Sequence, residues 1–202
     1  MKYSNVVVAG GGVLGSQIAF QAAYCGFNVT IWLRSEGSIG RTQPKIDHLK
    51  QTYIEAIEKM AEDKNAWCAG LADEDTFDKE ECLKKVENAY ANLKLELDMA
   101  KAVADADLVI ESMAENEKDK IAFYEKLSPL LPEKTVIVMA ASIITDSRAN
   151  RFRHLIQMND NIFNGLFRPF RIIFHCFVQI CHISRMMPAM MDFHRFCVNN
   201  RF

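Results

Sequence analysis

Three glycines near the amino terminus have the spacing found where a protein backbone binds a dinucleotide. Gly10, Gly12 and Gly15 follow the apolar run of residues 6–9 and precede a helical apolar pattern at residues 18–23. In such a turn the first glycine permits the tight bend, the second lets the backbone touch a pyrophosphate, and the third lets helix and strand pack closely. The helix then offers unpaired N–H groups and a partial positive charge to the phosphates.

The surroundings of this turn strengthen the prediction. A strand predicted to be buried on both faces leads into the turn, and a helix follows it directly. We therefore predict that the backbone of Gly10, Gly12, Val13, Leu14 and Gly15 binds the cofactor. The alternative, a glycine-rich turn that holds no ligand, is less favoured because strand, turn and helix agree.

The residue after the second predicted strand bears on which dinucleotide binds. That strand is expected over residues 28–33, and Arg34 and Ser35 follow it. Asp or Glu at this point would accept hydrogen bonds from both ribose hydroxyls of NAD, whereas Arg can accommodate the 2′-phosphate of NADP. These residues favour NADP locally, with the alternative that Arg34 is a solvated loop residue and Glu36 reaches the ribose.

Further polar residues follow the later predicted strands. Glu111, Ser112 and Glu115 come after the buried strand at residues 108–110, and Ser142 comes after the strand at residues 135–139. Ligands of open parallel sheets bind outside the carboxyl ends of the strands, so these side chains are expected on the binding edge.

The elements that position these residues form an alternating pattern of strands and helices. It predicts an α/β fold with a doubly wound parallel sheet of the Rossmann type, in a dinucleotide-binding domain over residues 1–146. A helical insertion is expected at about residues 44–90. Cover for the sheet is the favoured role for it, with a substrate groove or a partner surface as alternatives.

Three stretches in this order resemble one protein family: VVVAGGGVLGSQIAFQAAYCGFNVTIW, DLVIESMAENEKDKIAFYEKL and LPEKTVIV. They resemble the NAD-binding domain of the 3-hydroxyacyl-CoA dehydrogenases, within it the bacterial 3-hydroxybutyryl-CoA dehydrogenases. The resemblance covers about residues 1–139. It implies an oxidoreductase that transfers hydride between C3 of an acyl-CoA and NAD(P), with an acyl-CoA as its small-molecule partner.

The resemblance also assigns roles to individual residues. It implies that Glu115 contacts the nicotinamide ribose, that Lys120 lies beside the cofactor and the CoA-bound substrate, and that Ser142 is the surviving residue of a catalytic Asn-(Ser/Thr)-Ser run. The family's Asn is replaced here by Ala140. Arg34 replaces the family's ribose-binding Asp, so the resemblance favours NAD where the local residues favour NADP.

The general base of the family is a His, and this chain has no His at the expected position. It is expected near Phe163, whereas His154 comes too early and His175 too late. The function is therefore expected to be a 3-hydroxyacyl-CoA dehydrogenase or a module that holds NAD(P) without turnover, with another two-domain Rossmann dehydrogenase of 2- or 3-hydroxy acids as a weaker alternative.

Residues 147–202 form an atypical tail of a different composition. They contain no Lys, 8 Arg and 2 acidic residues, whereas residues 1–146 contain 14 Lys, 2 Arg and 24 acidic residues. We hypothesise that the sequence from about residue 140 is not the family's native sequence. Its His and Cys residues match no zinc spacing, so no metal site is predicted.

The whole-chain composition limits the partners and the location. A net charge of −2 gives no reason to expect nucleic acid or an anionic membrane as a partner. No apolar run approaches the roughly 20 residues of a membrane-spanning helix. Six scattered cysteines without a C-x-x-C pair or a signal peptide predict a cytoplasmic, reduced protein. A homo-oligomer is left open.

Overall fold

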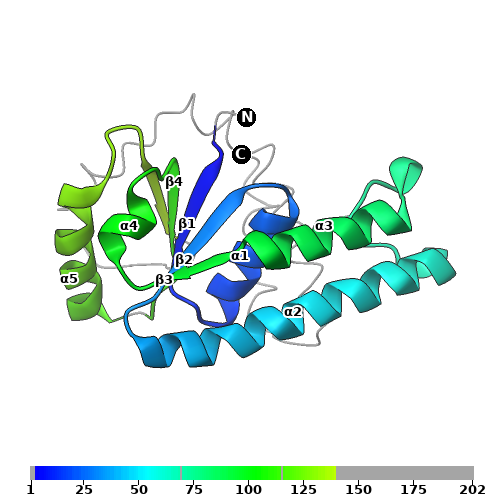
Figure 1. Cartoon of the computed structure of the whole chain (residues 1–202), viewed down its shortest axis with the longest axis horizontal. Coiled ribbons are helices and arrows are strands. Elements are labelled where there is room, and N and C mark those ends of the chain that lie inside the picture. Colours follow the sequence, from blue (N-terminus) through cyan, green and yellow to red (C-terminus); the bar gives the residue numbers. More distant parts are fainter. Residues whose placement is uncertain (1–2, 69, 115, 140–202) are drawn as a thin grey trace, which may run out of the picture.

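The computed structural model describes residues 3–68, 70–114 and 116–139. Within them, five parallel strands form one sheet in the order β3-β2-β1-β4-β5 (Figure 1). The strands are β1 (Asn5–Ala9), β2 (Asn28–Trp32), β3 (Lys94–Glu96), β4 (Leu108–Glu111) and β5 (Val136–Met139). This order confirms the predicted Rossmann-type sheet, in which the chain winds outwards from β1 in both directions.

Helices cover both faces of the sheet. They are α1 (Val13–Tyr24), α2 (Glu36–Glu62), α3 (Lys79–Asn92), α4 (Met99–Val103) and α5 (Glu117–Leu127), with short 3-10 turns at Lys64–Ala66, Glu74–Thr76 and Ser128–Leu130. One apolar cluster joins the sheet to α1, α2 and α3, and a second joins it to α4 and α5. No helix of the described residues is long and apolar enough to cross a membrane.

Strand β1 lies at the centre because its residues are apolar on both sides. Val6 and Val8 belong to the first cluster, and Val7 and Ala9 belong to the second, as the two-residue period of a strand requires. All four are at most 3% exposed. A strand buried on both faces accounts for the unbroken valine run in the sequence.

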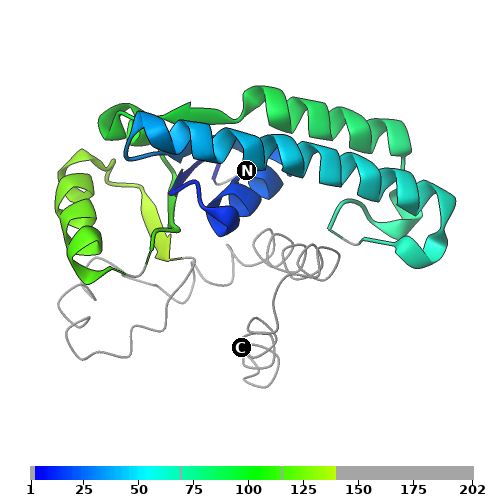
Figure 2. The ribbon, with the colours of Figure 1, turned by 90° about the horizontal axis from the view of Figure 1, so that it is seen from below.

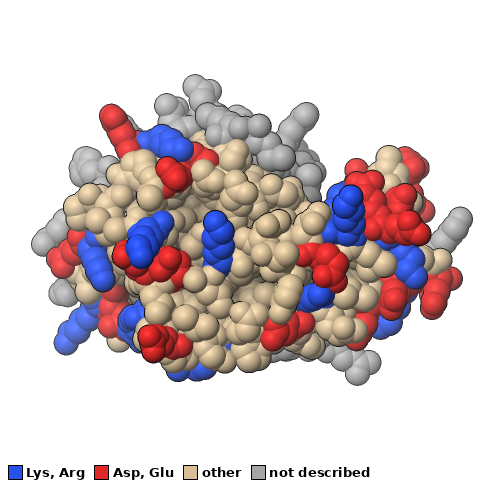
Figure 3. Space-filling view, in the orientation of Figure 1, with Lys and Arg blue, Asp and Glu red and all other residues tan. Residues whose placement is uncertain are grey.

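Helices α2 and α3 lie side by side and extend past the sheet as a helical hairpin (Figures 1 and 2). Gln21 of α1 holds this hairpin in place: its side chain is 2% exposed, accepts a hydrogen bond from the Tyr53 hydroxyl and donates one to the Gly70 carbonyl at 3.1 Å. Asp and Glu gather over the hairpin's tip on the face shown in Figure 3.

The inserted helices begin earlier in the chain than expected. Helix α2 starts at Glu36, not near residue 44, and contains Pro44 in its interior. Gly37, Gly40 and this proline gave residues 36–44 the composition of a loop.

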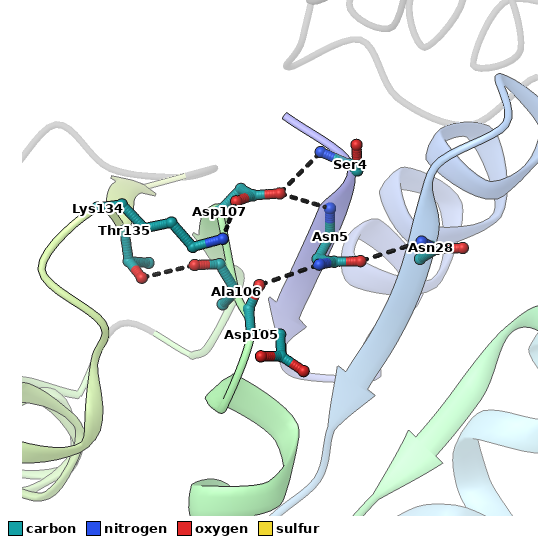
Figure 4. A network of polar contacts seen from close by, with 8 residues as sticks. All are labelled: Ser4, Asn5, Asn28, Asp105, Ala106, Asp107, Lys134 and Thr135. Atoms are coloured by element: carbon teal, nitrogen blue, oxygen red, sulfur yellow. Dashed lines mark hydrogen bonds and ion pairs between the residues drawn. The ribbon is translucent and has the colours of Figure 1, made fainter. Parts of the chain in front are cut away.

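Polar contacts join the strands at the amino edge of the sheet (Figure 4). One Asp107 oxygen accepts hydrogen bonds from the backbone N–H groups of Ser4 and Asn5, at 2.8 and 2.9 Å, and the other oxygen pairs with Lys134. These donors, Lys134 first, lower the pKa of Asp107 from 3.8 to about 2. The carboxylate therefore ties β1, β4 and the segment before β5 together.

We predict that Asp107→Asn destabilises the protein at neutral pH by about 1–3 kcal/mol, the contribution of hydrogen bonds to a charged group. The pKa of Asp107 is lower in the folded chain, so its stabilisation is complete above about pH 4 and is lost as the pH falls towards 2. Denaturant unfolding should show wild type and variant converging over that range. The exposed neighbour Asp105→Asn is the control, and a gap that stays constant with pH would contradict the assignment.

Candidate functional site

The carboxyl edge of the sheet holds the point at which the strand order reverses. Strand β1 pairs with β2 on one side and with β4 on the other, and the chain leaves β1 through the turn at Gly10–Gly12. In open α/β sheets the ligand crevice lies at such a switch point, outside the carboxyl ends of the strands.

Gly10 is required both by its backbone conformation and by its surroundings. Its φ of +118° lies in a region that L side chains rarely adopt. A Cβ atom at this position would lie 2.5 Å from the carbonyl oxygen of Ser112, the residue after β4. The Gly10 N–H donates to the Trp32 carbonyl at 3.1 Å, so the turn is fixed against both neighbouring strands.

Gly15 allows helix α1 to approach that turn. A Cβ atom on Gly15 would lie 2.0 Å from the Gly10 carbonyl oxygen and 3.3 Å from the Ser112 hydroxyl oxygen. The third glycine of the motif therefore has the packing role predicted from the sequence.

Gly12 differs because no atom of the described residues lies close to where its side chain would stand. A Cβ atom there would have nothing within 4 Å, and its φ of −67° and ψ of −177° are open to any residue. Neither packing nor conformation in the described residues requires a glycine here. The open space is where a ligand could approach the backbone.

The amino end of α1 fits an anion. No side chain in the described part of the chain caps it, and its first turn holds no acidic residue. The first N–H groups of a helix have no intrahelical carbonyl partner, and here they belong to Val13, Leu14 and Gly15. Val13 is 52% exposed, so this end of the helix is open to solvent. The residues present therefore suit a pyrophosphate group.

The sequence motif did not identify Gly11 and Thr42 as part of this turn. Thr42 is buried and donates a hydrogen bond from its hydroxyl to the Gly11 carbonyl at 3.1 Å. A Cβ atom on Gly11 would lie 2.1 Å from that hydroxyl oxygen. The run of three glycines could have indicated Gly11, whereas no local pattern indicates Thr42.

Arg34 lies just beyond β2, on the other side of β1 from β4. It is exposed and forms an ion pair with Asp119 of α5, 3.4 Å between Nη1 and Oδ2. Nearby, the Arg41 guanidinium donates to the Ser38 hydroxyl at 3.0 Å, and the hydroxyls of Ser35 and Ser38 are 3.1 Å apart. Cationic and hydroxyl groups therefore gather where the first turns of α2 meet the carboxyl edge.

Glu111 lies at the carboxyl edge, as the sequence predicted, but its side chain is buried. It is the last residue of β4 and is 0% exposed. One carboxylate oxygen accepts from the Met113 N–H at 2.6 Å, and the other lies 3.0 Å from the ammonium of Lys120. Lys120, predicted to lie beside the cofactor, is itself 6% exposed. The structure places it at this edge, paired with Glu111.

Two predicted site residues, Glu115 and Ser142, lie outside the described residues, as do His154 and His175. Their roles stay predictions.

The sheet order and the glycine turn define a dinucleotide-binding domain of the Rossmann type, and no side chain of the described residues caps the amino end of α1. Residues 5–154 match the family model described as "3-hydroxyacyl-CoA dehydrogenase, NAD binding domain". The chain belongs to this family, and the match continues past residue 139, where the sequence motifs placed the end of the resemblance.

The chain is similar to known dehydrogenases over part of their length. It is 28% identical over 138 residues to a mitochondrial hydroxyacyl-coenzyme A dehydrogenase of Rattus norvegicus, covering 68% of this chain and 38% of that protein. A solved diketoreductase is 34% identical with a TM-score of 0.55, covering 69% of this chain and 42% of the other. The Escherichia coli 3-hydroxybutyryl-CoA dehydrogenase structure is 25% identical with a TM-score of 0.51, and the match covers 69% of this chain and 25% of the other. The chain thus spans less than half the length of these relatives.

We predict that Gly12→Val leaves the fold intact but weakens NADPH binding at least about tenfold, because the side chain blocks the backbone approach to the pyrophosphate. Titration of NADPH fluorescence measures the effect. Gly40→Ala is the matched control, since a Cβ atom there also meets nothing within 4 Å. Normal NADPH binding by the valine variant would show that Gly12 does not touch the ligand.

Gly15→Ala should act on stability instead. The added methyl group would meet the Gly10 carbonyl, and such overpacking costs about 1–3 kcal/mol. Thermal unfolding of Gly12→Val and Gly15→Ala separates the role of Gly12 in ligand access from the role of Gly15 in packing. Equal losses of stability in Gly12→Val and Gly15→Ala would contradict this division.

Proposed function

We propose that this chain is the cofactor-binding part of an NAD(P)-dependent oxidoreductase that interconverts 3-hydroxyacyl-CoA and 3-ketoacyl-CoA. The observation that carries the proposal is the space at Gly12, which no atom of the described residues fills, beside the amino end of α1 at the switch point of the sheet. Membership of the 3-hydroxyacyl-CoA dehydrogenase family supports the choice of substrate class.

Bound NAD(P)⁺ would accept the hydride from C3 of the hydroxyacyl group, while the hydroxyl proton leaves to a base. The residues of this chain would bind and orient the dinucleotide. The backbone from Gly10 to Gly15 would hold the pyrophosphate, and Lys120 and Glu115 would lie on the nicotinamide side. Ser142 would lie near the substrate hydroxyl. The likeness to a 3-hydroxybutyryl-CoA dehydrogenase supports a short acyl chain.

A second candidate is a module that binds NAD(P) without turnover. The sequence favours it at one point, since no His stands near Phe163, where the family's base is expected. The two candidates differ in whether a base accepts the proton of the substrate hydroxyl, because hydride transfer from the hydroxyl-bearing carbon needs a group that takes this proton.

Oxidation of NADPH or NADH in the presence of acetoacetyl-CoA distinguishes these candidates. We expect absorbance at the nicotinamide band to fall only when protein and acetoacetyl-CoA are both present. Cofactor binding without oxidation would exclude the dehydrogenase and leave the binding module. Failure to bind either cofactor would exclude both.

We further propose that the cofactor is NADP rather than NAD. Arg34 stands where an acidic residue would accept the ribose hydroxyls of NAD, and its guanidinium can pair with a 2′-phosphate. Its present partner Asp119 is exposed and at 3.4 Å, and such surface pairs contribute only about 0–1 kcal/mol. A phosphate could therefore displace Asp119 from Arg34.

We predict that Arg34→Ala weakens NADPH binding about tenfold, the loss of one charge-assisted contact, while NADH binding changes little. Asp119→Asn should have the opposite effect and strengthen NADPH binding, because it removes the competing carboxylate. Fluorescence titrations with both cofactors give the ratios. Equal effects of Arg34→Ala on NADPH and NADH would refute the assignment to the 2′-phosphate.

We propose a cytoplasmic location and a domain boundary near residue 146. The described Cys25, Cys68 and Cys82 are all free thiols, and burial raises the pKa of Cys25 and Cys68. Protonated, unpaired thiols suit a reducing compartment. Assembly as a homo-oligomer stays a prediction.

A further inference from the structure

Glu111 and Lys120 occupy positions where the surrounding pattern is apolar. Val109, two residues before Glu111 on β4, packs in the cluster beneath α4 and α5, so Glu111 points to the same face of the sheet. Lys120 precedes Phe123 and Leu127 at helical spacing on α5, and both of these belong to that cluster. An aliphatic pair at these two positions would continue the core without interruption.

Stability does not explain why an ion pair stands there instead. The side chain of Lys120 is 7% exposed and that of Glu111 is 0% exposed, and the desolvation of both charges offsets most of their attraction. Moreover, no donor among the described residues makes a well-aligned hydrogen bond to Glu111 Oε2, although the Lys120 ammonium lies 3.0 Å away. Buried pairs of this kind are often no more stabilising than apolar residues of similar volume.

The pair lies at the carboxyl edge, next to the glycine turn. Glu111 is in register with Ala9, the residue before Gly10, and on its other side with Met139 of β5. Arg34 follows β2, the strand on the opposite side of β1, and its guanidinium reaches Asp119 of α5, the residue before Lys120. A dinucleotide that crosses the switch point places one nucleotide on each side. With the 2′-phosphate at Arg34, the nicotinamide half falls on the side of Glu111.

Both oxygens of this single carboxylate are engaged with the segment that follows β4. One holds the Met113 N–H at 2.6 Å and the other faces Lys120. We propose that Glu111 is a positioning residue, which fixes the Lys120 ammonium and the Met113 backbone against the nicotinamide half of the bound dinucleotide. This inference rests on the proposed cofactor binding.

Removal of the charges one at a time and together tests the proposal. The variants are Glu111→Gln, Lys120→Met and the double variant, each examined by thermal unfolding and by titration with NADPH. Each single variant should lose stability, because it removes one partner of a buried ion pair. The double variant should regain the thermal stability of the parent but keep an NADPH Kd raised about tenfold, since the positioned ammonium is gone.

Titration with adenosine 2′,5′-bisphosphate, which contains only the adenosine half, locates the effect. Its Kd should be the same in the double variant and the parent but raised in Arg34→Ala. Lys134→Met, which breaks the ion pair at the amino edge, is the matched control and should leave both Kd values unchanged.

A double variant that binds NADPH as tightly as the parent would overturn the inference, because the pair would then be structural only. Should that variant fail to fold, Glu111→Asp gives the same decision, since it keeps the charge but withdraws it by one methylene group. We expect Glu111→Asp to fold and to bind NADPH more weakly, and unchanged binding would overturn the proposal. A parent that binds neither ligand would instead refute the proposed function itself.

Discussion

The close approach of helix α1 to the turn after β1 is the constraint on which the rest of the domain depends. It is possible only because Gly15 lacks a side chain, since a Cβ atom there would lie 2.0 Å from the Gly10 carbonyl oxygen. The same contact brings in β4, whose following residue Ser112 lies against both glycines. Strand, helix and the neighbouring strand thus meet at one point, and the first N–H groups of α1 face the carboxyl edge.

The two edges of the sheet consequently have different roles. At the amino edge, side chains form hydrogen bonds with backbone groups of neighbouring segments. Asp107 accepts from the N–H groups of Ser4 and Asn5, and the Thr135 hydroxyl donates to the Ala106 carbonyl. At the carboxyl edge, Thr42 holds the Gly11 carbonyl, but no side chain of the described residues caps the amino end of α1 at Gly12. Contacts that stabilise the fold are therefore separated from groups that remain available to a ligand, and substitutions at the two edges should affect different properties.

Local sequence patterns predict much of the fold, and the features of the site that they did not predict have a common cause. The valine run, the glycine spacing and the apolar stripes predicted the sheet and α1, because each depends on neighbours in the chain. The burial of Glu111 and the contact between Thr42 and Gly11 depend on residues that only the fold brings together. Composition likewise concealed the start of α2 at Glu36, where packing overrides the glycines and the proline.

Arg34 and Lys120, the two cations of the proposed site, differ in how far their ion pairs are exposed to solvent. Arg34 and its partner Asp119 are 72% and 50% exposed, so solvent screens their attraction and a ligand phosphate can take the carboxylate's place at little cost. Lys120 and Glu111 are 7% and 0% exposed, and separating the two charges of a buried ion pair is costly. Under the proposed binding of NADP, the exposed pair would exchange partners, whereas the buried pair would keep its geometry. Recognition of the phosphate and orientation of the nicotinamide would then depend on two adjacent residues of α5, Asp119 in an exchangeable pair and Lys120 in a fixed one.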